Sequence, residues 1–227
     1  MTIRDRYNEV LEKIEEAKIK AGRKDEVKLI AVTKTVSNEA VEEVINAGAV
    51  AIGENRPQEL VKRMSEFGSA VEYHMIGRLQ TNKVRHIIKD VELVHSLDRM
   101  SLAKEIEARA KAIDKVQPCL LQVNISGEET KTGFSLEEVL FFVEDIAEMP
   151  YIIIKGLMTM APFSGNEKEI RSIFEKLYKL KRHLEEKHYT HIDMKYLSMG
   201  MSQDYEYAIL EGANMVRIGS NIFGKRE

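Results

Sequence analysis

The feature that most constrains this chain is a regular alternation between short apolar runs and longer amphipathic stretches. After one helical stretch at 3–21, eight short runs rich in Val, Ile and Leu recur, and each precedes a segment with helical spacing of apolar residues, the last one cut short. Such runs are typical of buried parallel strands, and such segments are typical of the helices that cover them. We expect strands at 28–34, 49–52, 71–76, 91–95, 119–123, 152–157, 195–197 and 215–217.

Between these strands the spacing predicts helices. Asn38 is expected to cap the helix after the first strand and Gly48 to end it, because these residue types favour those positions. The later helices are expected at 56–67, 82–88, 100–113, 135–148, 167–187 and 203–210.

The fold class that this order predicts is α/β, as a closed (β/α)8 TIM barrel with a leading N-terminal helix. No low-complexity linker interrupts the chain, so we expect one domain over residues 1–227. An open doubly wound sheet is the alternative. It usually carries a glycine-rich nucleotide-binding turn after the first strand, where this chain has Thr33-Lys34-Thr35.

Composition excludes several classes of protein. The 34 Lys and Arg residues nearly balance the 37 Asp and Glu residues, which argues against nucleic acid or an anionic membrane as partner. The N-terminus lacks the apolar run of a signal peptide, so we expect a cytoplasmic protein. The single cysteine, Cys119, falls in an expected strand and is interpreted as a buried thiol. The histidines show no convincing ligand spacing, so no metal site is expected.

Polar and small residues stand where the expected strands end. In a parallel barrel those ends form the mouth that binds ligands. The runs around Ser198, Gly200, Gly219 and Ser220 follow the seventh and eighth strands, where free backbone N–H groups commonly bind a phosphate. The ligand is therefore expected to carry a phosphate.

Lys34 ends an otherwise apolar strand at the same mouth. A partly desolvated lysine favours its neutral amine, which is a nucleophile. A lysine amine beside a phosphate site is the combination expected for a Schiff base with pyridoxal 5′-phosphate, PLP. A strand-end lysine that only reaches solvent fits the pattern equally well.

The chain resembles the YggS/PROSC family of PLP homeostasis proteins over nearly its whole length. The resemblance rests on six stretches of sequence: Ala31-Val-Thr-Lys34, Gly53-Glu-Asn-Arg56, His74-Met-Ile-Gly-Arg-Leu-Gln-Thr-Asn-Lys83, Gly156-Leu-Met-Thr159, Leu197-Ser-Met-Gly-Met-Ser202 and Val216-Arg-Ile-Gly219. It implies a barrel similar to the N-terminal domain of alanine racemase, with PLP covalently bound to Lys34.

The resemblance also implies the other binding residues. It sets the phosphate against Ser198, Gly200, Gly219 and Ser220, Arg217 opposite the pyridine nitrogen, and Asn55 and His74 near the ring. Lys131 fits a further family lysine that could act as a secondary amine, whereas Val36 stands where some relatives carry a second lysine.

The function that the resemblance implies is PLP homeostasis, by buffering or delivery to PLP-dependent apoenzymes, without established turnover. Arginine stays protonated and leaves the ring nitrogen unprotonated, which weakens the electron sink that catalysis needs. We expect a monomer that is not an enzyme. A one-base amino-acid racemase is the first alternative, and a phosphate-binding barrel without a Schiff base is the second.

Overall fold

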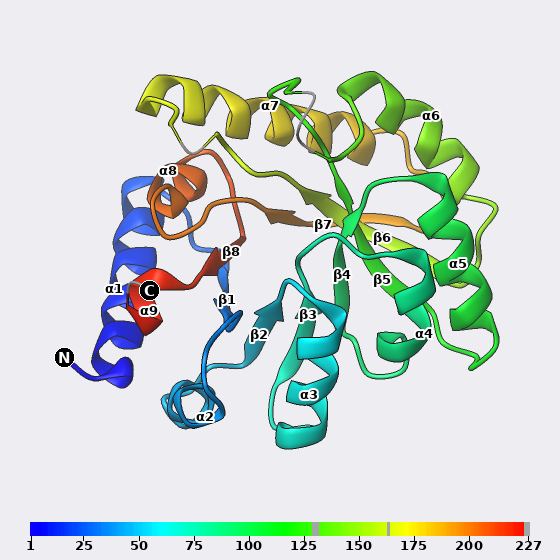
Figure 1. Cartoon of the computed structure of the whole chain (residues 1–227). Helices are drawn as coiled ribbons and strands as arrows, with labels where there is room; N and C mark the ends of the chain where they lie inside the picture. Colours follow the sequence, from blue (N-terminus) through cyan, green and yellow to red (C-terminus); the bar gives the residue numbers. More distant parts are fainter. Residues whose placement is uncertain (129–131, 163, 225–227) are drawn as a thin grey trace.

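The computed structural model describes residues 1–128, 132–162 and 164–224. In this part of the chain, eight parallel strands close into one barrel in sequence order, and the last strand pairs with the first. Helices surround the strands on the outside (Figure 1). The expected TIM barrel is confirmed, and the open doubly wound sheet is excluded because both of its edges would remain unpaired.

The strands are short, as parallel barrel strands commonly are. Their bounds are β1 (Lys28–Val32), β2 (Ala51–Glu54), β3 (Glu72–Met75), β4 (Leu93–Leu97), β5 (Gln117–Gln122), β6 (Ile152–Met158), β7 (Ile192–Ser198) and β8 (Met215–Ile218). The helices are α1 (Ile3–Lys20), α2 (Asn38–Asn46), α3 (Pro57–Phe67), α4 (Val84–Ile87), α5 (Met100–Lys111), α6 (Leu136–Ile146), α7 (Glu167–Glu185), α8 (Tyr205–Leu210) and α9 (Ser220–Phe223).

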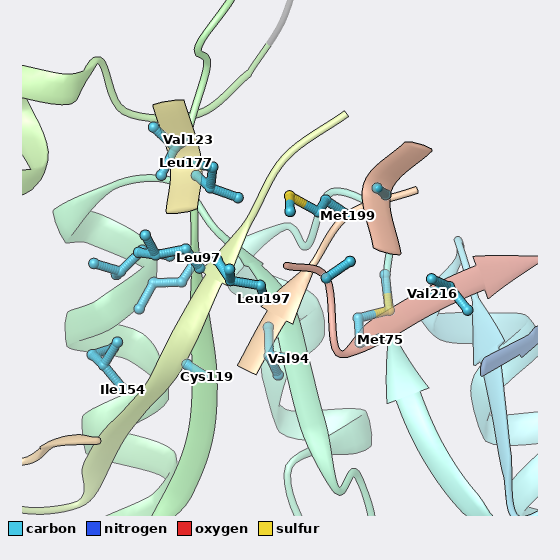
Figure 2. Close-up of a cluster of buried hydrophobic side chains, with 14 of the residues drawn as sticks. Met75, Val94, Leu97, Cys119, Val123, Ile154, Leu177, Leu197, Met199 and Val216 are labelled. Atoms are coloured by element: carbon cyan, nitrogen blue, oxygen red, sulfur yellow. The ribbon is translucent and has the colours of Figure 1, made fainter. Parts of the chain in front are cut away.

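Two apolar layers hold the barrel together because successive side chains of a strand point to opposite faces. The inner layer fills the barrel with Ile30, Ala51, Leu93, Leu120, Met158 and Met215. The outer layer lies between strands and helices, where Leu97, Cys119, Ile154, Leu197 and Val216 pack (Figure 2). The expected buried thiol at Cys119 is confirmed, and burial raises its pKa far above the usual range.

The leading helix α1 completes the outer ring. It packs along α8 and α9, as Figure 1 shows at the blue and red ends of the chain. Thr2 caps α1 in a capping box with Asp5. Because α9 has only one turn, it covers little of the barrel wall, and α1 supplies the missing apolar face through Tyr7, Val10 and Ile14. None of the described helices is long and apolar enough to cross a membrane.

Several predicted element boundaries were wrong. Ser37, not Asn38, caps α2: its Oγ accepts the Ala40 N–H at 3.3 Å, and Asn38 is the first helical residue. The helix expected at 82–88 is a 3₁₀ turn (Thr81–Lys83) followed by the single turn of α4. β7 begins three residues earlier than expected, at Ile192. It pairs with β6 from that residue on and so includes polar residues that the apolar pattern did not mark as part of a strand.

Candidate functional site

Lys34 lies in a tight turn at the carboxyl end of β1. The Val36 N–H donates to the Thr33 carbonyl at 3.0 Å, and Thr35 between them has a left-handed φ of 60°. The Lys34 side chain is exposed and forms no hydrogen bond or ion pair with the described residues. Its amine is therefore accessible to a ligand that enters the mouth of the barrel.

Arg217 of β8 is the buried cation of the site, with 4% of its surface exposed. One guanidinium nitrogen donates to Ser198 Oγ at 2.5 Å, and a second donates to the Thr159 carbonyl at 2.9 Å. Burial lowers the pKa of Arg217 to about 10, so the group is still a cation at neutral pH. Its two fixed partners, on β7 and after β6, hold the plane of the guanidinium in one orientation.

A chain of hydrogen bonds continues from Arg217 through the inside of the barrel. His95 Nδ1 lies 3.0 Å from Ser198 Oγ, His95 Nε2 lies 2.9 Å from His74 Nδ1, and His74 Nε2 lies 3.3 Å from a Glu72 carboxylate oxygen. Burial lowers the pKa of both histidines, so each carries one ring proton. Glu72 has its pKa lowered to about 2, mainly by His74 and also by Lys28.

These contacts admit one direction of donation. Because the ionised Glu72 carboxylate can only accept a hydrogen bond, the direction is fixed from that end of the chain, and Ser198, whose oxygen accepts from Arg217, donates its hydroxyl to His95 Nδ1. His95 then donates from Nε2 to His74 Nδ1, and His74 donates from Nε2 to the ionised Glu72. Each residue of this chain thus has a hydrogen-bond partner, and Arg217 acts as a donor at the mouth.

His74 lies deeper than the sequence suggested. It is buried in β3, reaches Arg217 only through His95 and Ser198, and lines a cavity of about 170 Å³ at the opposite end of the barrel. Asn55, by contrast, is exposed directly after β2. A Cβ added at Gly77 would lie 2.3 Å from the Asn55 carbonyl oxygen, so only glycine lets β3 end against this residue.

The loops after β7 and β8 come together as expected. Gly200 has a φ of +92°, and an added Cβ would lie 2.7 Å from Ala208 Cβ and 2.8 Å from Tyr205 Cα. Its carbonyl accepts the Arg217 N–H at 3.0 Å. A side chain at Gly200 would therefore push this loop away from α8 and from β8.

Backbone donors at this edge are available for an anion. Within the described part of the chain, the N–H groups of Gly200, Ser220 and Asn221 donate no backbone hydrogen bond. The Gly219 N–H instead donates to Ser202 Oγ at 3.2 Å, and Asn221 Nδ2 donates to the Ser202 carbonyl at 2.9 Å. Ser202 thus ties the two loops together. The donors fit a phosphate, whose oxygens accept several hydrogen bonds.

Sequence reasoning gave no role to three residues that the structure brings to the site: Glu72 and His95 in the barrel network, and Ser202 in the loop after β7. His95 follows the inward-facing Leu93 by two residues, and this parity is the signal that could have identified it. Lys131 lies outside the described residues. Among the described residues, no group of His, Cys, Asp and Glu side chains could hold a metal ion.

Comparison with known proteins identifies the family. Residues 7–227 match the family model "Alanine racemase, N-terminal domain". A "Pyridoxal phosphate homeostasis protein" of Aquifex aeolicus is 43% identical over 225 residues, 98% of each chain.

Solved structures agree. The structure of PipY from Synechococcus elongatus "with PLP bound" has a TM-score of 0.84, 27% sequence identity, and covers 98% of this chain and 100% of its own. An alanine racemase of Clostridium difficile has a TM-score of 0.76 at 17% identity and covers 98% of this chain and 57% of its own, so it shares the fold. The chain thus belongs to the alanine racemase N-terminal domain family and, within it, to the family of pyridoxal phosphate homeostasis proteins.

Proposed function

We propose that this protein binds PLP at the mouth of the barrel as a Schiff base on Lys34 and holds it for buffering or delivery to PLP-dependent apoenzymes. The bound cofactor supplies an aldehyde, which condenses with a lysine amine and releases water. We further propose that the protein is a cytoplasmic monomer that does not turn over a substrate.

The observation that carries the proposal is the set of groups at one mouth. An accessible lysine lies in the turn after β1, backbone N–H groups that donate no backbone hydrogen bond among the described residues follow β7 and β8, and a buried arginine stands on β8, the strand next to β1. These three features match the aldehyde, phosphate and ring nitrogen of PLP. The name of the Aquifex relative and the bound ligand of PipY support the same ligand.

Each expected residue has a role in the proposal. Gly200 and Ser220 offer backbone N–H groups to the phosphate, with Gly219 and Ser198 shaping the loops around it. Arg217 donates to the ring nitrogen. Asn55 lies at the open side of the ring, and His74 acts through His95 on Arg217.

Arg217 also supports binding without turnover. Arg217 stays protonated at neutral pH, so its guanidinium can only donate a hydrogen bond to the ring nitrogen. A ring nitrogen that faces such a donor stays unprotonated, and the ring is then a weak electron sink. The proposal therefore assigns the protein to storage and transfer of PLP.

Reduction with borohydride tests the Schiff base directly. The protein is incubated with PLP, reduced, digested and mapped by mass spectrometry. We expect the reduced adduct on the peptide that contains Lys34. An adduct confined to another lysine, or no adduct at all, contradicts the proposal.

Transfer is tested separately. The PLP-loaded protein is mixed with an apoenzyme that needs PLP, and recovery of activity is followed. In a parallel reaction, a panel of L- and D-amino acids is incubated with the loaded protein. Reactivation of the apoenzyme without any racemised or otherwise altered amino acid supports delivery. More moles of altered amino acid than of bound PLP would identify an enzyme.

A further inference from the structure

The turn that carries Lys34 is held from behind by a buried arginine on α3. Arg63 is 5% exposed, and its guanidinium donates to the Thr33 carbonyl at 3.3 Å and to the Val36 carbonyl. A further nitrogen donates to Asn38 Oδ1 at the start of α2. One side chain therefore binds both ends of the turn and the helix that follows it.

Glu54 fixes Arg63 in turn. Its carboxylate, fully buried at the end of β2, accepts from Arg63 Nε at 3.2 Å and from Thr33 Oγ1 at 2.7 Å. The planar guanidinium directs its donors along set directions, which a lysine ammonium cannot reproduce. The bonds to Glu54, to two backbone carbonyls and to Asn38 leave Arg63 one position.

The clamped turn is strained. Thr35, the residue after Lys34, has a φ of 60°, a left-handed conformation that β-branched residues rarely adopt. Such strain persists only where surrounding contacts hold it. The contacts that hold it here are the carbonyl bonds of Arg63 on either side of Lys34 and Thr35.

We infer that Arg63 is a positioning residue for Lys34: with Glu54, it holds the strained turn in the one conformation that directs the Lys34 amine into the mouth of the barrel. The inference rests on the proposed Schiff base. It explains why a buried ion pair lies outside the barrel wall, behind the turn that carries Lys34. Arg63 makes no contact with a ligand in this role and acts only through the backbone of residues 33–36.

The main test variant is Arg63→Lys, which keeps a positive charge beside Glu54 but cannot make all the bonds of the guanidinium. Arg63→Met combined with Glu54→Gln is the second variant, and it leaves no unpaired buried charge if the lysine variant folds poorly. Lys62→Met is the matched control, because Lys62 is the neighbouring residue on α3, is exposed and, among the described residues, pairs only with Glu59.

Three readouts are taken on the full chain: the Kd for PLP, the pH midpoint of the visible Schiff-base band, and the melting temperature without PLP. We expect Arg63→Lys to raise the Kd by roughly tenfold and to shift the pH midpoint, because a displaced amine forms a strained bond. Lys62→Met should match the wild type in the Kd and in the pH midpoint. The pH midpoint reports the Schiff base itself and does not follow a loss of global stability.

Thr35→Asn provides the rescue. Asparagine tolerates the left-handed conformation, so the turn then needs less support. In the Arg63→Lys protein, Thr35→Asn should restore most of the lost affinity, whereas with Arg63 present it should change the Kd by less than about twofold. Thr35 is exposed, so the substitution removes no packing.

The outcomes separate the two claims. If the wild type forms no reducible adduct on Lys34, the proposed function fails. If the wild type forms it, and both Arg63 variants bind PLP with the Kd and pH midpoint of Lys62→Met, the positioning role is overturned. Loss of affinity that Thr35→Asn fails to restore in either Arg63 background also overturns it, because the effect then does not pass through the turn.

Discussion

His95 Nε2 lies 2.9 Å from His74 Nδ1 in the interior of the barrel, and both rings are almost completely buried. Two imidazoles at this distance can share one hydrogen bond only if one donates and the other accepts. Burial lowers the pKa of each ring, and the pKa of His95 lies well below the usual value of 6.5 because His74 and Arg217 add to the effect. The pair is therefore a neutral link between Glu72 and Ser198.

The histidine pair predicts a loss of stability in mild acid. Because the folded pKa values are lowered, the unfolded chain takes up these protons first, and the free energy of unfolding falls as the pH drops below about 6.5. Each proton contributes a slope of roughly 1.4 kcal/mol per pH unit. Denaturant unfolding between pH 7 and pH 5 measures this slope.

His95→Gln should make that slope shallower, since one of the two groups is gone. His86→Gln, at an exposed position on α4, is the control and should keep the slope of the wild type. Equal slopes for the wild type and the His95→Gln protein would show that the pair does not titrate as neutral buried rings.

Lys34→Ala should abolish the reducible PLP adduct while leaving the fold intact. The side chain is exposed and makes no hydrogen bond or ion pair with the described residues, so its loss removes little packing. Circular dichroism and thermal melting should match the wild type, and PLP should bind weakly through the phosphate donors alone. A borohydride-fixed adduct in this variant would show that another lysine is the attachment point.

Gly200→Ala should weaken PLP binding and destabilise the protein. The new Cβ would lie less than 3 Å from atoms of Ala208 and Tyr205, and the alanine would have to keep the φ of +92°. The clash and the strained backbone together lower the free energy of unfolding by roughly 2 kcal/mol or more. Gly48→Ala is the matched control, because Gly48 also has a positive φ but its added Cβ meets nothing within 4 Å.

Affinity for PLP and for unphosphorylated pyridoxal, measured on both glycine variants, locates the defect. We expect Gly200→Ala to lose PLP affinity and the control to keep it, with pyridoxal weak for all proteins. If the wild type binds pyridoxal as tightly as PLP, the loops after β7 and β8 do not hold a phosphate.

Arg217→Glu should turn the site toward carbanion chemistry. A carboxylate opposite the ring nitrogen raises the pKa of that nitrogen, and a protonated ring withdraws electrons more strongly. With an added amino acid, a long-wavelength visible band should then appear that the wild type lacks. Arg217→Gln removes the positive charge without adding a negative one and should show little of the band. Loss of PLP binding in the Glu variant without any band would assign Arg217 to the phosphate.

Much of the arrangement of the candidate site could be predicted because it depends on strand order alone, whereas the roles of its residues stay predictions. In a parallel barrel, every strand ends at the same mouth, so Lys34, Asn55, Ser198 and Arg217 could be placed together from their positions after apolar runs. The depth of a residue could not be predicted in this way. His74, which was expected near the ring, lies in the interior of the barrel and is linked to the mouth through His95 and Ser198, because depth depends on the stagger between neighbouring strands.

Element ends were the least predictable local feature. Ser37 and Asn38 are both good capping residues, and only the path of the turn after Lys34, with Arg63 bonded to Asn38, makes Ser37 the cap. The family resemblance correctly indicated the barrel, which the geometry and the relatives both confirm.

By itself, the sequence determined the alternation of eight strands with helices and hence the barrel, because the spacing of apolar residues sets which faces must be buried. It also determined that a lysine follows the first apolar run; the structure ends β1 at Val32 and places Lys34 in the turn after it. Only the tertiary structure decided how Arg63 reaches the turn of Lys34 and how His95 joins His74 to Ser198. Those contacts link elements far apart in the chain, and hydrogen bonds need ångström-scale placement that packing, not local pattern, provides.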